Sequence, residues 1–202
     1  MAWKAALKAG LIAVRDGEDY ANKRHRYERA RDHLSRAYDA LIATADPDHL
    51  VLAKICLWKG IAYNENMDVR DPEARNDPAI AEYLRGLEHL QKVSKDAATT
   101  TRMSLYNSLG VAHHHRVGGG SAHPRGAVPG PSGFPPPAPI PPESVRFYRM
   151  ARAVFQSAKS KNDELVAIME KVENNSGRGV LRGGAFEAAR RGNYVVTHLA
   201  SS

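Results

Sequence analysis

Cysteine and long apolar runs are scarce in this chain of 202 residues, and each scarcity excludes a class of structure. Cys56 is the single cysteine, so neither a disulfide within the chain nor a metal site built from several cysteines can form. No run approaches the roughly 18 apolar residues that a membrane-spanning helix requires, so we predict no membrane span. The residues after the first lysine also lack the apolar core of a secretory signal peptide.

Sequence signatures of catalysis are lacking as well. The chain contains no phosphate-binding loop, no G-x-G-x-x-G, no H-E-x-x-H and no G-x-S-x-G motif. His113, His114 and His115 are consecutive, and successive helical side chains point about 100° apart, so they cannot converge on one metal ion. Cys56 lies in an apolar segment, where a buried thiol is unreactive. We therefore predict a non-enzymatic chain with no cofactor and no metal site.

Basic residues outnumber acidic ones and give a formal net charge of +7. Such a balance attracts acidic partners such as RNA, acidic peptides or anionic lipid head groups. The densest basic run is Lys23–Arg31, and with Tyr20 and Tyr27 as stacking faces it could bind RNA. A helical wheel places both tyrosines on one stripe with Leu34, which suits a packed core better. RNA is therefore the alternative partner, and a protein or acidic peptide is the predicted one.

The N-terminal segment Met1–Arg15 has two interpretations. It carries lysines and an arginine but no acidic residue, which is typical of a mitochondrial presequence. The same residues also fit the first unit of a structural repeat. We predict a cytoplasmic protein and keep a mitochondrial location as the alternative.

The spacing of three glycines is the most informative pattern in the chain. Gly10, Gly60 and Gly110 recur at a constant interval, each inside an apolar segment that otherwise has helical periodicity. A glycine inside a helix costs about 1 kcal/mol relative to alanine, so its repetition indicates a packing requirement. We infer that a second helix closely approaches each glycine. The three segments are Trp3–Val14, Leu50–Asn64 and Met103–Arg116.

A second helix is predicted after each of these segments. The second helices are expected at Tyr20–Thr44, Ala79–Lys95 and Glu143–Lys161. They share a small–large–small pattern, which reads Ala30-Leu34-Ala37, Ala79-Tyr83-Gly86 and Ala151-Phe155-Ala158. Asp46–Asp48 and Asp68–Pro78 are predicted turns, and a further helix is predicted at Asp163–Glu173.

Proline and glycine are concentrated in one segment, residues 118–142, which holds nine prolines and six glycines. Such a composition cannot form a packed element, so we predict a disordered insert. The predicted organisation is helical repeats over 1–117, the insert over 118–142 and returning helices over 143–173. A poorly ordered Gly/Arg-rich tail is predicted over 174–202.

The third unit resembles the tetratricopeptide repeat (TPR), whose pattern is W-x2-L-G-x2-Y followed by A-x3-F-x2-A. Tyr106-x2-Leu109-Gly110-x2-His113 is similar to the first half, and Ala151-x3-Phe155-x2-Ala158 is similar to the second. The middle unit carries a weaker form, Cys56-x2-Lys59-Gly60-x2-Tyr63. The two halves of the third unit are farther apart than in a standard repeat, by about the length of the proline-rich segment. The resemblance therefore implies that the insert separates the two helices of one repeat.

The resemblance implies an all-α fold of antiparallel helix hairpins stacked as a solenoid. In such a fold the first helices line a concave surface that holds a segment of a partner protein. We therefore predict a protein–protein interaction scaffold with a mixed basic and apolar groove; the rival prediction is a basic helical RNA-associated protein. The groove residues carried over from the family are Lys4, Lys8, Lys54, Trp58, Asn64, Asn107 and His114.

Overall fold

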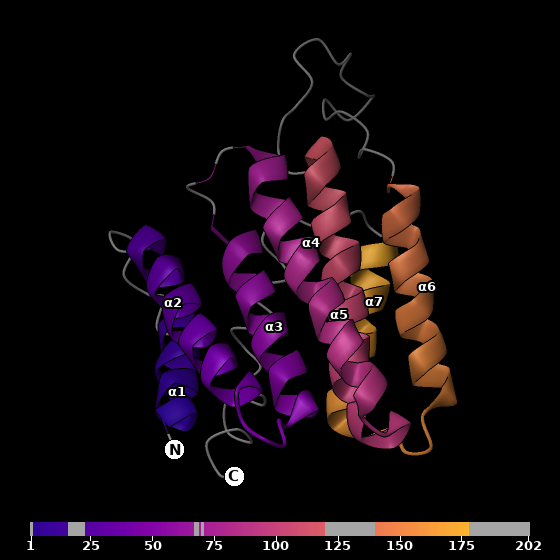
Figure 1. Cartoon of the computed structure of the whole chain (residues 1–202). Helices are drawn as coiled ribbons and strands as arrows, with labels where there is room; N and C mark the ends of the chain where they lie inside the picture. Colours follow the sequence, from indigo (N-terminus) through magenta and orange to yellow (C-terminus); the bar gives the residue numbers. More distant parts are fainter. Residues whose placement is uncertain (1, 16–22, 67–68, 70, 120–139, 178–202) are drawn as a thin grey trace.

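The computed structural model of the chain describes residues 2–15, 23–66, 69, 71–119 and 140–177. Over these ranges the chain forms seven α-helices and no strand, so the predicted all-α class is confirmed (Figure 1). The helices are α1 (Ala2–Arg15), α2 (Lys23–Ile42), α3 (His49–Asn64), α4 (Pro72–His89), α5 (Lys95–His114), α6 (Pro142–Ser157) and α7 (Asp163–Gly177). A short 3₁₀ helix, Leu90–Lys92, follows α4, and a π-helical turn, His115–Gly119, extends α5.

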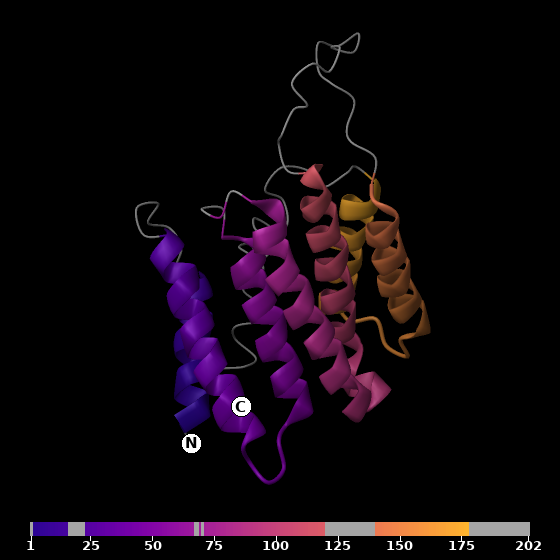
Figure 2. The same cartoon turned by 45° about the horizontal axis from the view of Figure 1, so that its top comes forward.

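The helices pack as hairpins that lie side by side. α1 packs on α2, α3 on α4 and α5 on α6, and α2 and α4 each also contact the helix that follows. α3 touches both α1 and α5, while α7 packs against α5 and α6. Figures 1 and 2 show the α1–α2 hairpin at one end of the row and α6 with α7 at the other. Three buried apolar clusters follow one another along this row.

The three glycines lie where helices approach closely, as their spacing predicts. A Cβ atom added to Gly10 would lie 2.8 Å from Cγ of Leu34 on α2. At Gly60 and Gly110 an added Cβ would meet the rings of Tyr83 and Tyr148 at less than 3.0 Å. Contacts this short do not occur between real Cβ atoms and ring carbons. Each first helix therefore has a glycine notch that receives a large side chain from the second helix.

The side chain that fills the third notch differs from the predicted one. Tyr148 lies against Gly110, whereas Phe155 is only partly buried and Ala158 follows the end of α6. The buried small–large–small pattern of α6 is Ser144-Tyr148-Ala151, seven residues before the predicted one. Seven residues make nearly two helical turns, so both patterns lie on the same face of the helix. The periodicity alone could not select between them.

Two helices begin more than one turn earlier than the sequence pattern predicts. α4 begins at Pro72, because the Asp71 carboxylate accepts a hydrogen bond from the Glu73 amide at 3.0 Å and Pro72 suits the first helical position. Pro78 lies inside α4, so the predicted turn over residues 68–78 is wrong from residue 72 onward. Ala74, whose carbonyl loses its amide donor to this proline, is exposed and can be solvated. α5 likewise begins at Lys95 rather than Met103.

The predicted insert and tail fall largely outside the described residues. Gly118 and Gly119 belong to the helical turn after α5, and α6 begins at Pro142, where the predicted insert ends. Residues 120–139 and 178–202 lie outside the described ranges. Residues 174–177 continue α7, so the prediction of a poorly ordered segment is wrong for these four residues.

Candidate functional site

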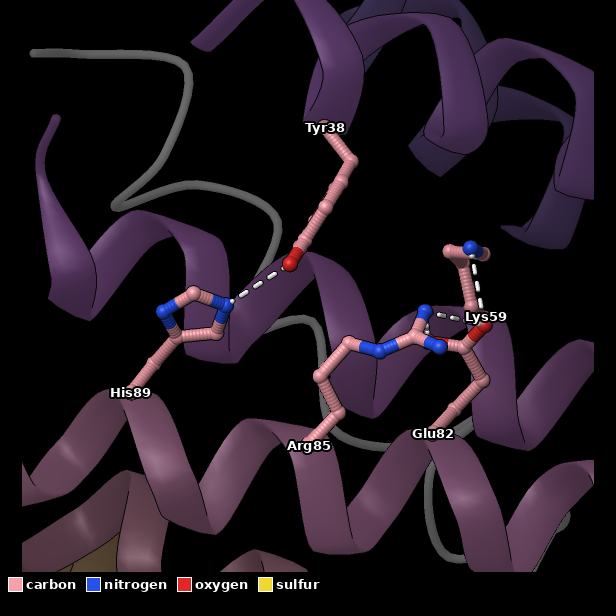
Figure 3. A network of polar contacts seen from close by, with 5 residues as sticks. All are labelled: Tyr38, Lys59, Glu82, Arg85 and His89. Carbon is pink, nitrogen blue, oxygen red and sulfur yellow. Dashed lines mark hydrogen bonds and ion pairs between the residues drawn. The ribbon is translucent and has the colours of Figure 1, made fainter. Parts of the chain in front are cut away.

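A cluster of polar side chains lies where α2, α3 and α4 meet (Figure 3). At one side of it, Lys59 Nζ lies 2.8 Å from Oε1 of Glu82, and both side chains are 9% exposed. Arg85 Nη1 donates to the two oxygens of the same carboxylate at 3.2 and 3.3 Å. One carboxylate on α4 therefore compensates two cations, one of them almost completely buried.

The other side of this cluster consists of a tyrosine and two histidines. Tyr38 Oη lies 2.9 Å from Nε2 of His89, and Nδ1 of His89 lies 3.0 Å from Nδ1 of His49. The two imidazole rings are stacked at 5.3 Å. Burial and the neighbouring His49 lower the pKa of His89, so the neutral ring is favoured at neutral pH. A neutral His89 ring has one donor nitrogen and one acceptor nitrogen.

Cys56 is fully buried beside the same cluster. Burial, followed by the charge of Glu82, raises the pKa of the Cys56 thiol to about 12. A thiol in this state holds almost no thiolate at neutral pH, and the thiolate is the nucleophilic form. The arrangement therefore connects three helices and offers no activated sulfur. Within the described ranges, no group of three or more His, Cys, Asp or Glu side chains is placed to hold a metal ion.

Five of the seven predicted groove residues are at least partly exposed on the first helices, Asn107 on α5 among them. Lys4 and Lys8 are exposed on α1, one helical turn apart, and Lys54 and Trp58 are partly exposed on α3, also one turn apart. Trp58 packs its ring against the apolar cluster of the first three helices. Its indole nitrogen has no hydrogen-bond acceptor among the described residues.

Two predicted groove residues are buried, and Asn107 is hydrogen-bonded to another helix. Asn64 and His114 are buried, with 6% and 3% of their surface exposed, so their side chains are not available at the surface. The Asn64 side-chain oxygen lies 3.4 Å from Nδ1 of His115 in the turn after α5. Asn107 accepts a hydrogen bond from the Asn175 side chain at 3.1 Å, which joins α5 to α7.

The three consecutive histidines have different surroundings. The His113 ring stacks on Phe147 at 5.3 Å, whereas the imidazole of His115 lies toward Asn64. Burial lowers the pKa of all three, and for His115 burial and the charge of Arg75 lower it to about 4. These rings therefore act as largely neutral packing groups at neutral pH.

The basic run at the start of α2 is partly occupied by contacts within the fold. The guanidinium of the buried Arg26 donates to the Val14 carbonyl, and Arg31 lies 4.7 Å from the centre of the Tyr63 ring. Tyr27 is 4% exposed, and burial raises its pKa to about 12. Tyr27 is therefore a core residue, as its stripe with Leu34 indicates, and not a stacking face for RNA. Tyr20 lies outside the described residues.

The sequence patterns missed the cluster on α4. Glu82, Arg85 and His89 are spaced three and four residues apart, which places them on one face of a helix. That spacing was the available signal, but nothing in it shows that Lys59 and Tyr38 would face it from two other helices.

No helix of the described part is both long and apolar enough to cross a lipid bilayer. Comparisons with protein families, with curated proteins and with solved structures find no match to this chain.

Proposed function

We propose that this chain is a non-enzymatic scaffold of the TPR type, which holds an acidic, partly apolar peptide or helix of a partner protein. The observation that carries the proposal is the glycine notch, which occurs in three successive hairpins at equal sequence spacing. In each, a glycine of the first helix receives a large buried side chain of the second, namely Leu34, Tyr83 or Tyr148. A recurring hairpin that packs on its neighbours is the defining unit of helical repeat proteins.

The contacts between hairpins support a solenoid with the first helices on its inner side. α3 contacts α1 and α5, and α5 contacts α7, whereas the backbones of α2, α4 and α6 approach one another at fewer positions, and α2 reaches α4 through the long side chains of Tyr38 and His89. Closer contact along one layer of helices is what a curved stack of hairpins requires. The inner layer of such a stack is the surface that repeat proteins commonly use to bind partners.

The charge of the first two helices of this layer, α1 and α3, favours an acidic partner. Neither α1 nor α3 contains an aspartate or a glutamate, and both carry lysines. Lys8 and Lys54 have no ion-pair partner among the described residues. Complementary charge steers association and selects partners, and a large aromatic side chain such as Trp58 is a common anchor.

The double variant Lys54→Glu with Trp58→Ala tests the proposal. We expect the wild-type chain to bind a labelled acidic, leucine-containing peptide, measured by fluorescence anisotropy. A peptide with lysine in place of each acidic residue should bind at least about tenfold more weakly. The double variant should also bind the acidic peptide about tenfold or more weakly while its circular dichroism stays helical.

The matched control is Lys92→Glu with Leu84→Ala; both residues are exposed, Leu84 within α4 and Lys92 in the 3₁₀ helix that follows it. This control variant reverses one charge and truncates one apolar side chain outside the proposed groove. It should bind the acidic peptide as the wild type does. Equal losses in both double variants would overturn the groove assignment. Binding of a single-stranded RNA more tightly than the peptide, unaffected by the groove variant, would instead establish the RNA-associated alternative.

A further inference from the structure

A pocket on the surface of α6 and α7 has no part in the proposed function. It has a volume of about 330 Å³ and combines apolar walls with an acidic rim. Its lining residues are Phe155, Val166, Met169, Glu170, Glu173 and Asn174. Val166 is 40% exposed and contributes an apolar surface to the pocket.

The helix that forms this pocket is acidic within a basic protein. α7 carries four acidic residues and one lysine, whereas the whole chain has a net charge of +7. Glu173 is already bound to Arg152, whose Nε lies 2.6 Å from its carboxylate. Glu170 is exposed and has no ion-pair partner among the described residues, so its charge is available to a ligand.

The opposite end of the molecule has the complementary composition. α1 has three basic residues and no acidic one. Lys4, Lys8 and Ile12 follow one another at intervals of four, so they form one stripe along the helix, and all three are exposed. Figure 1 shows α1 at one end of the row of helices and α6 at the other. One copy therefore presents a basic, apolar stripe at one end and an acidic, apolar pocket at the other.

We propose that a second copy of this chain occupies the pocket, with α1 of one copy docked against α6 and α7 of the next. Ile12 supplies an aliphatic side chain for the space between Phe155, Val166 and Met169, and Lys8 lies near the rim that carries Glu170. The two surfaces are different patches of one chain, so the contact is heterologous and leaves a free patch at each end of the pair. Copies then add head to tail as the concentration rises.

This inference does not rest on the proposed function, because it needs α7 and Ile12 and needs neither Lys54 nor Trp58; the two proposals share only the charge of Lys8. Its test is the oligomeric state of the purified full chain, measured by sedimentation velocity over a wide concentration range. The expected result is a weight-average mass that rises past that of a dimer at low salt. The mass should fall at high salt, because ions screen the exposed charges.

Two charge reversals, Lys8→Glu and Glu170→Lys, decide whether these faces form the contact. Both side chains are exposed, so each variant is expected to fold. Each variant alone should sediment as a monomer, since its altered patch repels the native patch of another copy. An equimolar mixture should associate again, because the glutamate of one variant then faces the lysine of the other.

Lys92→Glu is the control, since it makes the same charge change outside both faces and should associate as the wild type does. A wild-type chain that remains monomeric at every concentration and at low salt overturns the proposal. So does a mixture of the two reversals that stays monomeric, or a Lys8→Glu variant that associates like the wild type. In that last case the copies use another surface.

Discussion

The second and third hairpins, α3–α4 and α5–α6, share the same contact between their helices. They differ in the length of the chain that connects the two helices. In both, a glycine of the first helix receives a buried tyrosine ring of the second, Gly60 with Tyr83 and Gly110 with Tyr148. The chain between glycine and tyrosine is much longer in the third hairpin, because it includes residues 120–139. Doubling the length of a connection costs only about 0.6 kcal/mol more in closure entropy. The fit between notch and ring, rather than the connection, determines how these helices pack.

The two hairpins differ in the hydrogen-bond partners of their tyrosine hydroxyls and in the burial of their ion pairs. The Tyr83 hydroxyl is hydrogen-bonded to the side chain of Ser108, whereas the buried Tyr148 hydroxyl has no partner among the described residues. The second hairpin also contains the buried pair Lys59–Glu82, while the pair Arg152–Glu173 that joins α6 to α7 lies at the surface. Hairpins with similar helix packing therefore contain polar groups that should contribute very differently to the free energy of unfolding. Substitutions at these groups can measure that difference.

The largest difference in the free energy of unfolding is expected between variants of the two ion pairs. Glu82→Ala leaves the Lys59 charge buried without its partner, which should lower the free energy of unfolding by about 3–5 kcal/mol. Glu173→Ala removes a pair whose side chains are 32% and 53% exposed, and should cost about 1 kcal/mol or less. Urea unfolding of both variants, followed by circular dichroism, makes the comparison. Equal losses would mean that Lys59 is solvated once Glu82 is removed.

Replacing the glycine of each of these two notches with alanine should cause the next largest change in the free energy of unfolding. Gly60→Ala and Gly110→Ala each place a methyl group against a fully or almost fully buried tyrosine ring and should lower the free energy of unfolding by about 1–3 kcal/mol. Alanine is otherwise favoured over glycine in a helix by up to about 1 kcal/mol, so the sign of the effect is diagnostic. The measurement is the denaturant concentration at the midpoint of unfolding. A shift of this midpoint reports a change in stability when the dependence of the free energy of unfolding on denaturant concentration is unchanged.

Gly86→Ala is the matched control for the notch variants. Its added Cβ would lie 3.0 Å from a terminal methyl of Leu105, a side chain that can yield more easily than a ring. Its loss should therefore be smaller than at either notch. Stabilisation at Gly60 or Gly110 would show that the tyrosine rings are not held where the structure places them.

The smallest effects concern the tyrosine hydroxyls. Tyr83→Phe removes a hydrogen bond and leaves Ser108 without that partner, which should cost about 1 kcal/mol. Tyr148→Phe removes a buried hydroxyl that has no partner in the described part of the chain, and should be neutral or stabilising. Thermal unfolding of the two variants side by side is sufficient. Similar losses from both would indicate that the Tyr148 hydroxyl has a partner, such as a bound water.

The surface proposed to bind a partner could be predicted only in part. Lys4, Lys8, Lys54 and Trp58 are at least partly exposed on first helices, as the repeat pattern implies. Asn64 and His114 are buried, because the turn after α5 and the neighbouring helices pack near them. Helical periodicity identifies one buried face of a helix, but a helix in a stack of hairpins has neighbours on several sides.

By itself, the sequence determined the helical class and the places where helices approach one another. Apolar periodicity and glycine inside a helix are local properties, so both can be read along the chain. Only the tertiary structure decided that Tyr148 rather than Phe155 fills the third notch, since the two lie on one face of α6. The tertiary structure alone also determined that Lys59 is buried beside Glu82. Charges on separate helices become a pair only when packing of the apolar residues around them brings the helices together.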